Sequence, residues 1–389
     1  MNILVITDFF PHPFRPHEGI FVWEQVKELS KRHTIAVISP RMAYPPFRRY
    51  KTYRFPVRKI PGKEHKNGVP VFRPLYRQIP LVGEWFMPHW FFLKLLILVS
   101  KEGLAVDLIQ AHWAYRAGWW AVLLGRLLRK PVIITVHGSD VNYWLDEPVK
   151  KKRIRWALRH ASGVIFISRK LADKVKSAKL KLRKQIIISN GIPSEKMRRS
   201  FANKNQVHPL KQIVFVGNLL PVKGADILLD ALHHLKMQES GWCAVIGGDG
   251  PEREVLEQQS AALGLTLKVK FLGRLTNPEV LALLQTADVL VIPSRNEGGP
   301  LILLEALGNG KTVASFDVGN VAEVLHSPNL GYVVKERTPE ALAEAIQKAL
   351  KQPVNPALAK KEAAKYLLEN TVKQIETFYS IKLSKGENV

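Results

Sequence analysis

The stretch VLVIPSRNEGGPLILLEALGNGKTVAS (residues 289–315) predicts a strand, a glycine turn, a helix and a second strand. Val289–Ile292 is a short, wholly apolar run, and Thr312–Ser315 is a second β-type run after further glycines. Between them, Pro300 suits the first turn of a helix, where a missing amide hydrogen costs little. Two apolar strands joined by a helix indicate a parallel α/β sheet.

The same alternation of strands and helices extends over most of the 389 residues. The expected strands of the first half are Ile3–Thr7, Thr34–Ile38, Asp107–Ala111, Val132–Val136, Val164–Ile167 and Ile186–Ser189. Those of the second half are Ile213–Val216, Ala244–Ile246, Val269–Leu272, Val289–Ile292 and Thr312–Ser315. Helical patterns lie between them, among them Val22–Lys31, Leu171–Ala178, Asp226–His234, Glu252–Leu263, Pro278–Thr286 and Pro300–Leu307. We therefore expect an α/β fold with two doubly wound, Rossmann-like parallel sheets.

The length of the chain predicts two domains, because 389 residues exceed one ordinary hydrophobic core. The polar stretch 191–210 separates the two series of strands and is the expected linker. We expect an N-terminal domain over residues 1–190 and a C-terminal domain over residues 211–370. A helical tail is expected over residues 371–389.

Positive charge is concentrated in the first half of the chain. Residues 1–200 hold 38 Lys and Arg against 13 Asp and Glu, whereas the remainder holds 20 of each. The whole excess of +25 therefore lies in the first half. Such asymmetry favours contact of one domain with a polyanion or an anionic membrane, with a general solubility bias as the alternative.

The apolar segment 86–99 is too short for a bilayer span, which takes about 20 residues. It is either a helix packed into the core or an amphipathic segment that enters a membrane interface.

Bases and aromatic residues alternate in 48–55 and 71–77, but no nucleic-acid-binding motif accompanies them, so we expect no nucleic-acid partner. The single cysteine, Cys243, suits a reducing compartment, and the first residues are typical of a strand rather than of a signal peptide. We expect a cytoplasmic protein, peripheral on the inner face of the cell membrane.

Glu297 and Glu305 bracket Gly298–Gly299 at the expected start of a helix. Glycines let the backbone approach a ligand closely, and bare amides at a helix N-terminus bind anions such as a diphosphate. Glu305 lies about 7–8 Å further along the axis, the offset of a neighbouring ribose, whose hydroxyls can donate to a carboxylate. Glu297 precedes the amides, where a sugar on the diphosphate would lie. The stretch predicts a nucleotide-sugar site, although two glutamates at this spacing are a weak signal alone.

Three further strand ends of the second half carry glycine turns, at 214–224, 245–252 and 271–275. Lys223 in the first turn could place a positive charge on the diphosphate. Ligands of open parallel sheets lie beyond the carboxyl ends of the strands, so these turns and the two glutamates form one predicted donor site. The candidate donor-binding residues from the turns are Gly217, Asn218, Lys223, Gly250, Arg274 and Leu275.

The order of these motifs resembles that of the retaining glycosyltransferases of family 4, which have the GT-B architecture of two Rossmann-like domains facing across a cleft. The resemblance covers nearly the whole chain. It rests on E-G-G-P-L-I-L-L-E, G-N-L-L-P-V-K-G and G-D-G-P-E in the second half and on A-H-W-A-Y-R-A-G, T-V-H-G-S-D-V-N and I-I-S-N-G-I-P in the first. Within the family the chain is most similar to teichuronic-acid biosynthesis glycosyltransferases, through V-F-R-P-L-Y-R-Q-I-P and T-V-H-G-S-D-V-N.

The resemblance implies catalytic roles for three residues. Glu297 contacts the transferred sugar, His137 lines the sugar and acceptor side, and Lys223 stabilises the leaving diphosphate. The implied reaction displaces a nucleoside diphosphate with retained anomeric configuration, and the leaving phosphate oxygen deprotonates the acceptor hydroxyl. The acceptor is expected to be lipid-linked or a polysaccharide of the cell envelope.

The resemblance also implies how the substrates are held. The backbone of Gly298, Gly299 and Leu301 surrounds the diphosphate, and Glu305 binds the ribose. Gly19 lets the first loop approach the diphosphate or the acceptor. His112, at a strand end, is placed on the acceptor side, although a structural role suits it better than a catalytic one.

Asn218 stands where the family usually has an arginine, so stabilisation of the leaving group rests more on Lys223, with Arg274 as a candidate to compensate. We expect no metal or other cofactor, because the chain has no Asp-x-Asp and few ligand clusters. A dinucleotide-dependent oxidoreductase would carry a G-x-G-x-x-G motif after the first strand. Residues 8–19 hold a single glycine, so this class of enzyme is disfavoured. A nucleotide-sugar epimerase or a phosphorylase of the same architecture remains open, as does a non-catalytic membrane- or nucleic-acid-binding protein.

Overall fold

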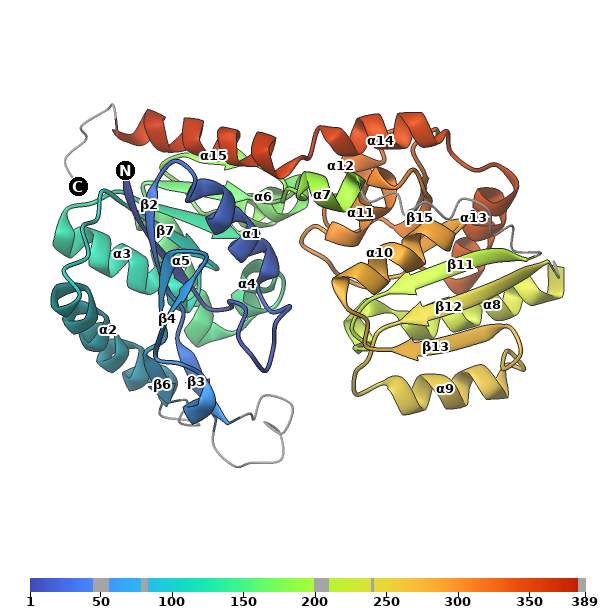
Figure 1. Cartoon of the computed structure of the whole chain (residues 1–389), viewed down its shortest axis with the longest axis horizontal. Helices are drawn as coiled ribbons and strands as arrows, with labels where there is room; N and C mark the ends of the chain where they lie inside the picture. Colours follow the sequence, from blue (N-terminus) through green and yellow to red (C-terminus); the bar gives the residue numbers. More distant parts are fainter. Residues whose placement is uncertain (45–55, 78–82, 199–209, 239–240, 384–389) are drawn as a thin grey trace. The chain divides into compact units, whose positions relative to one another are not determined.

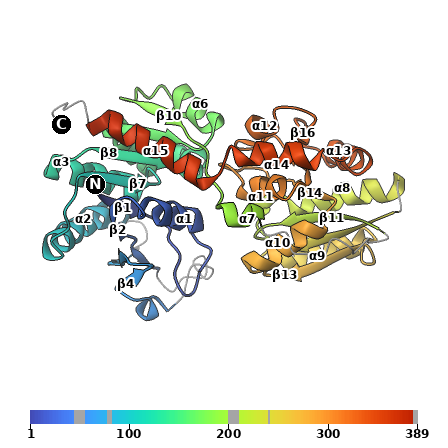
Figure 2. The ribbon, with the colours of Figure 1, turned by 45° about the horizontal axis from the view of Figure 1, so that its top comes forward.

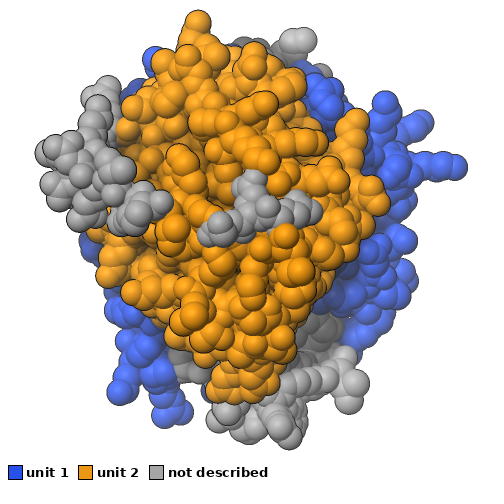
Figure 3. Space-filling model, turned by 90° about the vertical axis from the view of Figure 1, so that its right-hand side faces the viewer, with its two compact units in different colours: residues 1–188, 371–389 blue, residues 189–370 orange. Residues whose placement is uncertain are grey.

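The computed structural model describes residues 1–44, 56–77, 83–198, 210–238 and 241–383. The chain divides into two units, which Figure 3 colours separately. Unit 1 comprises residues 1–188 and 371–389, and unit 2 comprises residues 189–370. The C-terminal segment thus groups with the first half of the chain. The basic and aromatic residues 48–55 lie outside the described residues.

The described residues of unit 1 form an eight-stranded sheet. Its strands are β1 (Asn2–Thr7), β2 (Thr34–Ile38), β4 (Lys63–Lys66), β5 (Val69–Phe72), β7 (Leu108–His112), β8 (Val132–Val136), β9 (Gly163–Phe166) and β10 (Gln185–Ile187). They lie in the order β10-β9-β8-β7-β1-β2-β5-β4, and β4 is antiparallel to β5 whereas the other pairs are parallel. A separate parallel pair is formed by β3 (Arg41–Ala43) and β6 (Leu75–Arg77).

Helices cover both faces of this sheet (Figures 1 and 2). They are α1 (Ile20–Leu29), α2 (Gly83–Lys101), α3 (Arg116–Leu128), α4 (Ser139–Asn142), α5 (Pro148–His160), α6 (Arg169–Ser177) and, from the end of the chain, α15 (Leu368–Leu383). Because strand side chains alternate between faces, neighbouring positions of β7 face different helices. Ile109 lies under Gly125 of α3, whereas Gln110 accepts a hydrogen bond from the hydroxyl of Tyr379 in α15.

Helix α2 has one buried and one exposed apolar face. Phe91, Leu95 and Val99 are buried at the four-residue spacing of a helix face. The exposed face carries large side chains that are 51–67% exposed, namely Trp85, Phe86, Trp90, Leu93 and Ile97. The segment 86–99 therefore packs into the core along one side only. No helix in the described ranges is both long and apolar enough to cross a membrane.

The described residues of unit 2 form a six-stranded parallel sheet. Its strands are β11 (Lys211–Val216), β12 (Trp242–Gly247), β13 (Val269–Gly273), β14 (Val289–Ile292), β15 (Thr312–Phe316) and β16 (Tyr332–Val334), in the order β13-β12-β11-β14-β15-β16. Its helices are α7 (Ser194–Arg198), α8 (Ala225–Gln238), α9 (Arg253–Ala262), α10 (Asn277–Thr286), α11 (Leu301–Gly308), α12 (Val321–Val324), α13 (Pro339–Lys351) and α14 (Pro356–Ala364). The expected α/β class with two parallel sheets is confirmed.

Two local details differ from expectation. Helix α11 begins at Leu301 rather than at Pro300, because Pro300 keeps an extended ψ of 114° and is the N-cap residue. The stretch 191–210, expected as a linker, contains helix α7. Met197 of α7 packs on Gly308 of α11, where a Cβ would lie 2.8 Å from Met197 Cγ.

Candidate active site

The strand order of unit 2 reverses between β11 and β14. The chain runs from β11 outward to β12 and β13, then crosses to β14 on the other side of β11. Ligands of open parallel sheets bind outside the carboxyl ends of the strands at such a reversal. The loops that follow β11 and β14 start there, and they contain G-N-L-L-P-V-K-G (217–224) and E-G-G-P (297–300).

Lys223 and Glu297 come from these two loops and form an ion pair. Lys223 ends a single 3₁₀ turn, Pro221–Lys223, and its Nζ lies 2.6 Å from Glu297 Oε1. The same oxygen accepts a hydrogen bond of 2.8 Å from the Ser294 hydroxyl. The side chains of Lys223 and Glu297 are 29% and 14% exposed, so a ligand can reach both. The structure thus brings two sequence-predicted residues together and adds Ser294, which was not predicted.

The glycines of these loops are required by contacts within the protein. Gly224 has φ 68°, and a Cβ there would lie 2.0 Å from the carbonyl oxygen of Pro293. A Cβ on Gly250 would lie 2.3 Å from the carbonyl oxygen of Leu219. Because only glycine permits such approach of two backbones, these positions hold the loops after β11, β12 and β14 against one another.

The N-terminus of α11 directly follows Gly298–Gly299. Since Pro300 is the N-cap, the amide of Leu301 opens the helix, and the first amides of a helix lack intrahelical acceptors. Asn320 Oδ1 is buried, has no partner among the described residues, and would lie 3.3 Å from a Cβ on Gly299. The amides are the donors that α11 offers to a diphosphate, whereas the Asn320 oxygen, from the N-cap of α12, can only accept a hydrogen bond.

Glu305 lies on the second turn of α11 and is 8% exposed. Its Oε1 is 2.5 Å from Nζ of Lys196, in α7. A carboxylate can accept several hydrogen bonds, so Glu305 retains acceptor capacity for ribose hydroxyls. Lys196 was not predicted, because nothing in the linker-like stretch indicated a helix packed on α11.

The remaining predicted donor residues occupy strand ends of the same sheet. Gly217 and Asn218 follow β11, and the side chain of Asn218 is exposed. Arg274 follows β13 and is exposed, with no hydrogen bond or ion pair to the part of the chain that is described. Leu275 packs on Gly247, where a Cβ would lie 2.6 Å from Leu275 Cδ1. Among the described residues, none of these side chains forms a hydrogen bond or an ion pair with Lys223.

In unit 1, two histidines meet at the carboxyl ends of β7 and β8. His112 ends β7 and His137 follows β8, and His112 Nδ1 lies 2.8 Å from His137 Nε2. Their rings stack with centroids 5.1 Å apart. The rings of Trp113 and Phe21 also contact His137, at 4.7 and 4.8 Å between centroids. The predicted catalytic and acceptor-side histidines are therefore direct neighbours.

Burial keeps both imidazoles neutral. Desolvation lowers the pKa of His112 to about 3, and desolvation together with the nearby His112 lowers the pKa of His137 well below its usual value. In a neutral pair one ring donates the shared hydrogen bond and the other accepts it. His112 Nε2 and His137 Nδ1 are buried and have no hydrogen-bond partner among the described residues.

Two buried carboxyl groups lie near the histidines and were not predicted. Asp140 accepts hydrogen bonds of 3.0 Å from the amides of Ala114 and Gly138. Asp8 directly follows β1, and its Oδ1 lies 3.7 Å from Arg116 Nε. Desolvation raises the pKa of each acid to about 6. Within the described residues, no group of three His, Cys, Asp or Glu side chains is placed to hold a metal ion.

Gly19 is the N-cap residue of α1 and has φ 65°. A Cβ at this position would lie 2.3 Å from the carbonyl oxygen of Phe9. The close approach that the structure shows is therefore between two parts of the first loop, and it requires glycine.

Two family profiles match the chain. "Glycosyltransferase Family 4" matches residues 19–196, and "Glycosyl transferases group 1" matches residues 176–371. A protein of Bacillus subtilis (strain 168) named for teichuronic acid biosynthesis, the glycosyltransferase TuaC, is 33% identical over 358 residues, which cover 89% of this chain and 88% of TuaC. The chain belongs to the glycosyltransferases. It is an enzyme of the hexosyltransferase class, as the sequence predicted.

This glycosyltransferase also resembles solved structures over nearly its full length. Sucrose-phosphate synthase from Thermosynechococcus elongatus aligns with a TM-score of 0.75 and 19% identity, covering 99% of this chain and 100% of that chain. Anabaena Alr3699/HepE, solved in complex with UDP, aligns with a TM-score of 0.73 and 20% identity, covering 98% and 100%. At these identities the likeness shows the fold, and that fold is GT-B, as predicted.

Proposed function

We propose that this glycosyltransferase moves a sugar from a nucleoside-diphosphate sugar to a lipid-linked or polysaccharide acceptor in cell-envelope glycan synthesis, with retention of configuration. The observation that carries the proposal is the Lys223–Glu297 pair at the strand-order reversal of unit 2. A cation suits the leaving diphosphate, and a carboxylate suits the sugar carbon on which positive charge develops. The complex of HepE with UDP and the name of TuaC support a nucleotide-sugar donor and a role in glycan synthesis.

In the proposed reaction, the bond between the anomeric carbon and the diphosphate oxygen breaks. The acceptor oxygen bonds to the same face of that carbon, and its proton passes to the leaving oxygen. Lys223 and the first amides of α11 stabilise the negative charge on the diphosphate. Glu297 stabilises the oxocarbenium-like sugar by its charge, without forming a bond to it. Neither step calls on a metal or another cofactor.

Donor binding is tested by a thermal-shift screen of the full chain against nucleoside diphosphates and their sugars. A ligand that binds the folded state raises Tm by mass action. We expect UDP and UDP-sugars to raise Tm, because HepE was solved with UDP and with UDP-glucose. Failure of every nucleoside diphosphate and nucleotide sugar to raise Tm would contradict the proposal.

Retention is tested on the product. Once a donor and acceptor pair is found, the proton coupling at the anomeric carbon, measured by NMR as product first forms, should match that of the donor. A product of the opposite anomeric configuration would overturn the proposed mechanism while leaving the transferase activity intact.

We further propose that unit 1 places the enzyme on the anionic inner face of the cell membrane. The exposed face of α2 supplies aromatic and aliphatic side chains, and Lys94 and Lys101, about two turns apart on the same helix, are also exposed. Tryptophan, leucine and lysine on one helix are typical of segments that lie in a membrane interface. The positive excess of residues 1–200 matches the negative lipid surface, so the occupant of this face is an anionic bilayer.

A further inference from the structure

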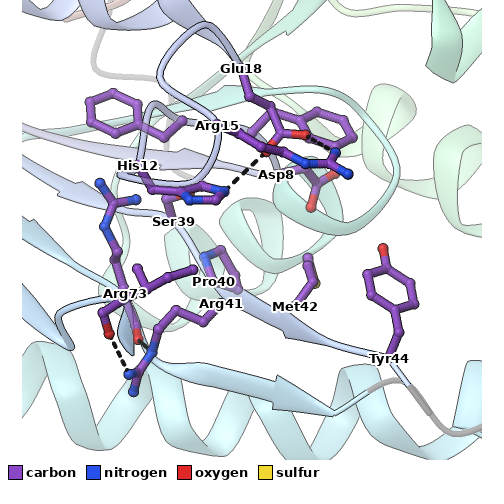
Figure 4. Close-up of a pocket in the computed structure, with 13 residues that line it drawn as sticks. Asp8, His12, Arg15, Glu18, Ser39, Pro40, Arg41, Met42, Tyr44 and Arg73 are labelled. Carbon is purple, nitrogen blue, oxygen red and sulfur yellow. Dashed lines mark hydrogen bonds and ion pairs between the residues drawn. The ribbon is translucent and has the colours of Figure 1, made fainter. Parts of the chain in front are cut away.

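Two hollows of unit 1 differ in how much they can hold. Figure 4 shows the hollow between the loops after β1 and β2, where Arg15 pairs with Glu18. Its space of about 40 Å³ admits no more than a few water molecules. The other hollow is a groove between strand β6 and helix α2, with a volume of about 330 Å³, which is in the range of small-molecule sites.

The groove runs along one face of α2. Its lining residues come from two elements, namely Met87, Trp90, Phe91 and Lys94 from α2 and Leu75, Tyr76 and Arg77 from β6. The four residues of α2 follow one another at intervals of three, one and three positions, so they lie on a single side of the helix. At about 1.5 Å per residue, the groove extends roughly 10 Å along the helix axis from Met87 to Lys94.

The floor of the groove is fixed by a cluster of aromatic rings. Phe91 and Tyr76 are each 2% exposed, and their rings meet edge to face with centroids 5.2 Å apart. The ring of Trp120, in α3, packs on both of them. Its indole nitrogen donates a hydrogen bond of 2.9 Å to the carbonyl oxygen of Pro88 in α2. Because this cluster holds α2 against β6 and α3, the groove exists before any ligand binds.

The groove borders the exposed apolar face of α2. Phe86, Trp90, Leu93 and Ile97 recur at intervals of four, three and four residues, so they form an exposed stripe along the helix. Trp90 belongs both to this stripe and to the groove. The groove therefore lies between the stripe and the buried side of the helix that Phe91 begins. An alkyl chain in contact with the stripe can enter the groove without leaving apolar surface.

The groove carries positive charge and no negative charge. Its charged residues are Lys94 and Arg77, both of which are exposed, and no Asp or Glu is among the described residues that line it. Neither cation forms a hydrogen bond or an ion pair with the described part of the chain. An apolar floor with two cations at its edge matches an amphiphile in which an alkyl chain is joined to an anionic group. Met87 adds an adaptable side chain, which suits a flexible chain as ligand.

We infer that this groove takes up one acyl chain of an anionic phospholipid from the bilayer, and that Lys94 and Arg77 bind the phosphate of the same lipid. The inference rests on the membrane face proposed for α2 and goes beyond it, because it assigns one lipid molecule to one site. A bilayer surface attracts exposed cations anywhere on unit 1, whereas a lipid in the groove depends on the residues that line it.

Soluble lipids test the groove in the absence of a bilayer. The probes are dihexanoyl phosphatidylglycerol, dihexanoyl phosphatidylcholine, glycerol 3-phosphate and geranyl phosphate, each below the concentration at which it forms micelles, with binding to the full chain measured by calorimetry. We expect the phosphatidylglycerol to bind with one molecule per chain. Its affinity should exceed those of the zwitterionic lipid and of glycerol 3-phosphate, which has no acyl chain, by about tenfold or more.

Variants at exposed positions of the same helix locate the binding. Lys94→Gln, Arg77→Gln and Trp90→Ala should each weaken binding of the phosphatidylglycerol by about tenfold. Lys101→Gln and Leu93→Ala are the matched controls, because both side chains are exposed on α2 but do not line the groove, and they should leave this binding unchanged. Hydrogen exchange of the unsubstituted chain should slow in peptides that cover residues 75–77 and 87–94 when the lipid is added. This last measurement does not depend on the folding of any variant.

Equal losses for Lys94→Gln and Lys101→Gln would overturn the inference, as would equal affinity for the two dihexanoyl lipids. Tighter binding of geranyl phosphate than of the phosphatidylglycerol would assign the groove to a prenyl-linked phosphate and overturn the phospholipid assignment. Failure of the proposed membrane face looks different, because the soluble phosphatidylglycerol would bind as expected while the chain does not sediment with anionic vesicles.

Discussion

The Nζ atom of Lys223 lies 2.6 Å from Oε1 of Glu297, although the two residues are 74 positions apart in the chain. One comes from the loop after β11 and the other from the loop after β14, so the contact spans the strand-order reversal of unit 2. It places a cation and an anion side by side in the position proposed for the diphosphate and the sugar. The predictions below concern this site first and then the rest of the molecule.

Removing either charge of the pair should slow sugar transfer. We expect Lys223→Ala and Glu297→Gln each to lower kcat about 10²- to 10³-fold, because preorganised charges at the reacting bond are lost. Initial rates of nucleoside diphosphate release provide the measurement. Lys348→Ala, which removes a lysine that is 65% exposed elsewhere in unit 2, is the control. If neither Lys223→Ala nor Glu297→Gln changes turnover, the site is wrongly assigned.

Glu305 should distinguish nucleoside diphosphates from inorganic pyrophosphate. Its proposed partners are ribose hydroxyls, and a hydrogen bond to a charged group is worth about 1.5–3 kcal/mol. Glu305→Gln should therefore weaken binding of UDP about 10- to 100-fold and leave binding of inorganic pyrophosphate unchanged, as measured by calorimetry. Equal losses for both ligands would place Glu305 at the diphosphate or in a purely structural role with Lys196.

Gly224 should not tolerate a side chain. Gly224→Ala would push a Cβ to 2.0 Å from the Pro293 carbonyl oxygen at φ 68°, and we expect a loss of about 3 kcal/mol or more and a lower Tm. Gly241→Ala is the control, because a Cβ there would meet no atom of the described residues within 4 Å, its chain neighbours aside. Thermal unfolding of both variants gives the comparison, and similar Tm values for the two would contradict the packing described here.

The pKa of Asp8 should appear in the pH dependence of stability. Burial raises this pKa from 3.8 to about 6, so between these values the folded chain holds a proton that the unfolded chain has released. Stability contributed by Asp8 therefore falls as the pH rises through this window. The Asp8→Asn chain has no carboxyl group at this position and so does not lose stability in this way. Its free energy of unfolding, relative to that of the unsubstituted chain, should therefore rise by about 2–3 kcal/mol from pH 4 to pH 7.5.

Urea unfolding of Asp8→Asn and the unsubstituted chain at the two pH values checks this prediction. Asp8→Glu is a useful comparison, because it keeps a titrating group at the same position. A stability difference between Asp8→Asn and the unsubstituted chain that does not change with pH would show that Asp8 titrates normally.

The exposed face of α2 should bind anionic vesicles. We expect sedimentation with vesicles that contain an acidic phospholipid, weakening as salt rises, because salt screens the attraction. Trp90→Glu with Ile97→Glu should abolish sedimentation. Leu267→Glu, at a fully exposed leucine of unit 2, should leave it unchanged. Equal binding to neutral and acidic vesicles would refute the electrostatic part of the proposal.

Much of the architecture was predictable because its signals are local. The apolar runs at Thr34–Ile38, Val132–Val136 and Val289–Ile292 are strands with the predicted bounds. The start of α11 was predicted one residue early, since proline fits both the N-cap and the first helical position. Helix α7 was missed because its five residues are too few to produce a periodic pattern.

The sequence by itself determined the fold class and the residue types of the candidate site, because strand and helix periodicity and glycine turns are properties of neighbouring residues. The tertiary structure alone decided which of those residues meet. The pairs Lys223–Glu297, Lys196–Glu305 and His112–His137 join segments that are distant in the chain, and only strand order and helix packing bring them together. The same holds for Asp8, whose burial depends on neighbours contributed by β7 and α3, and an acid after one apolar strand does not reveal those neighbours.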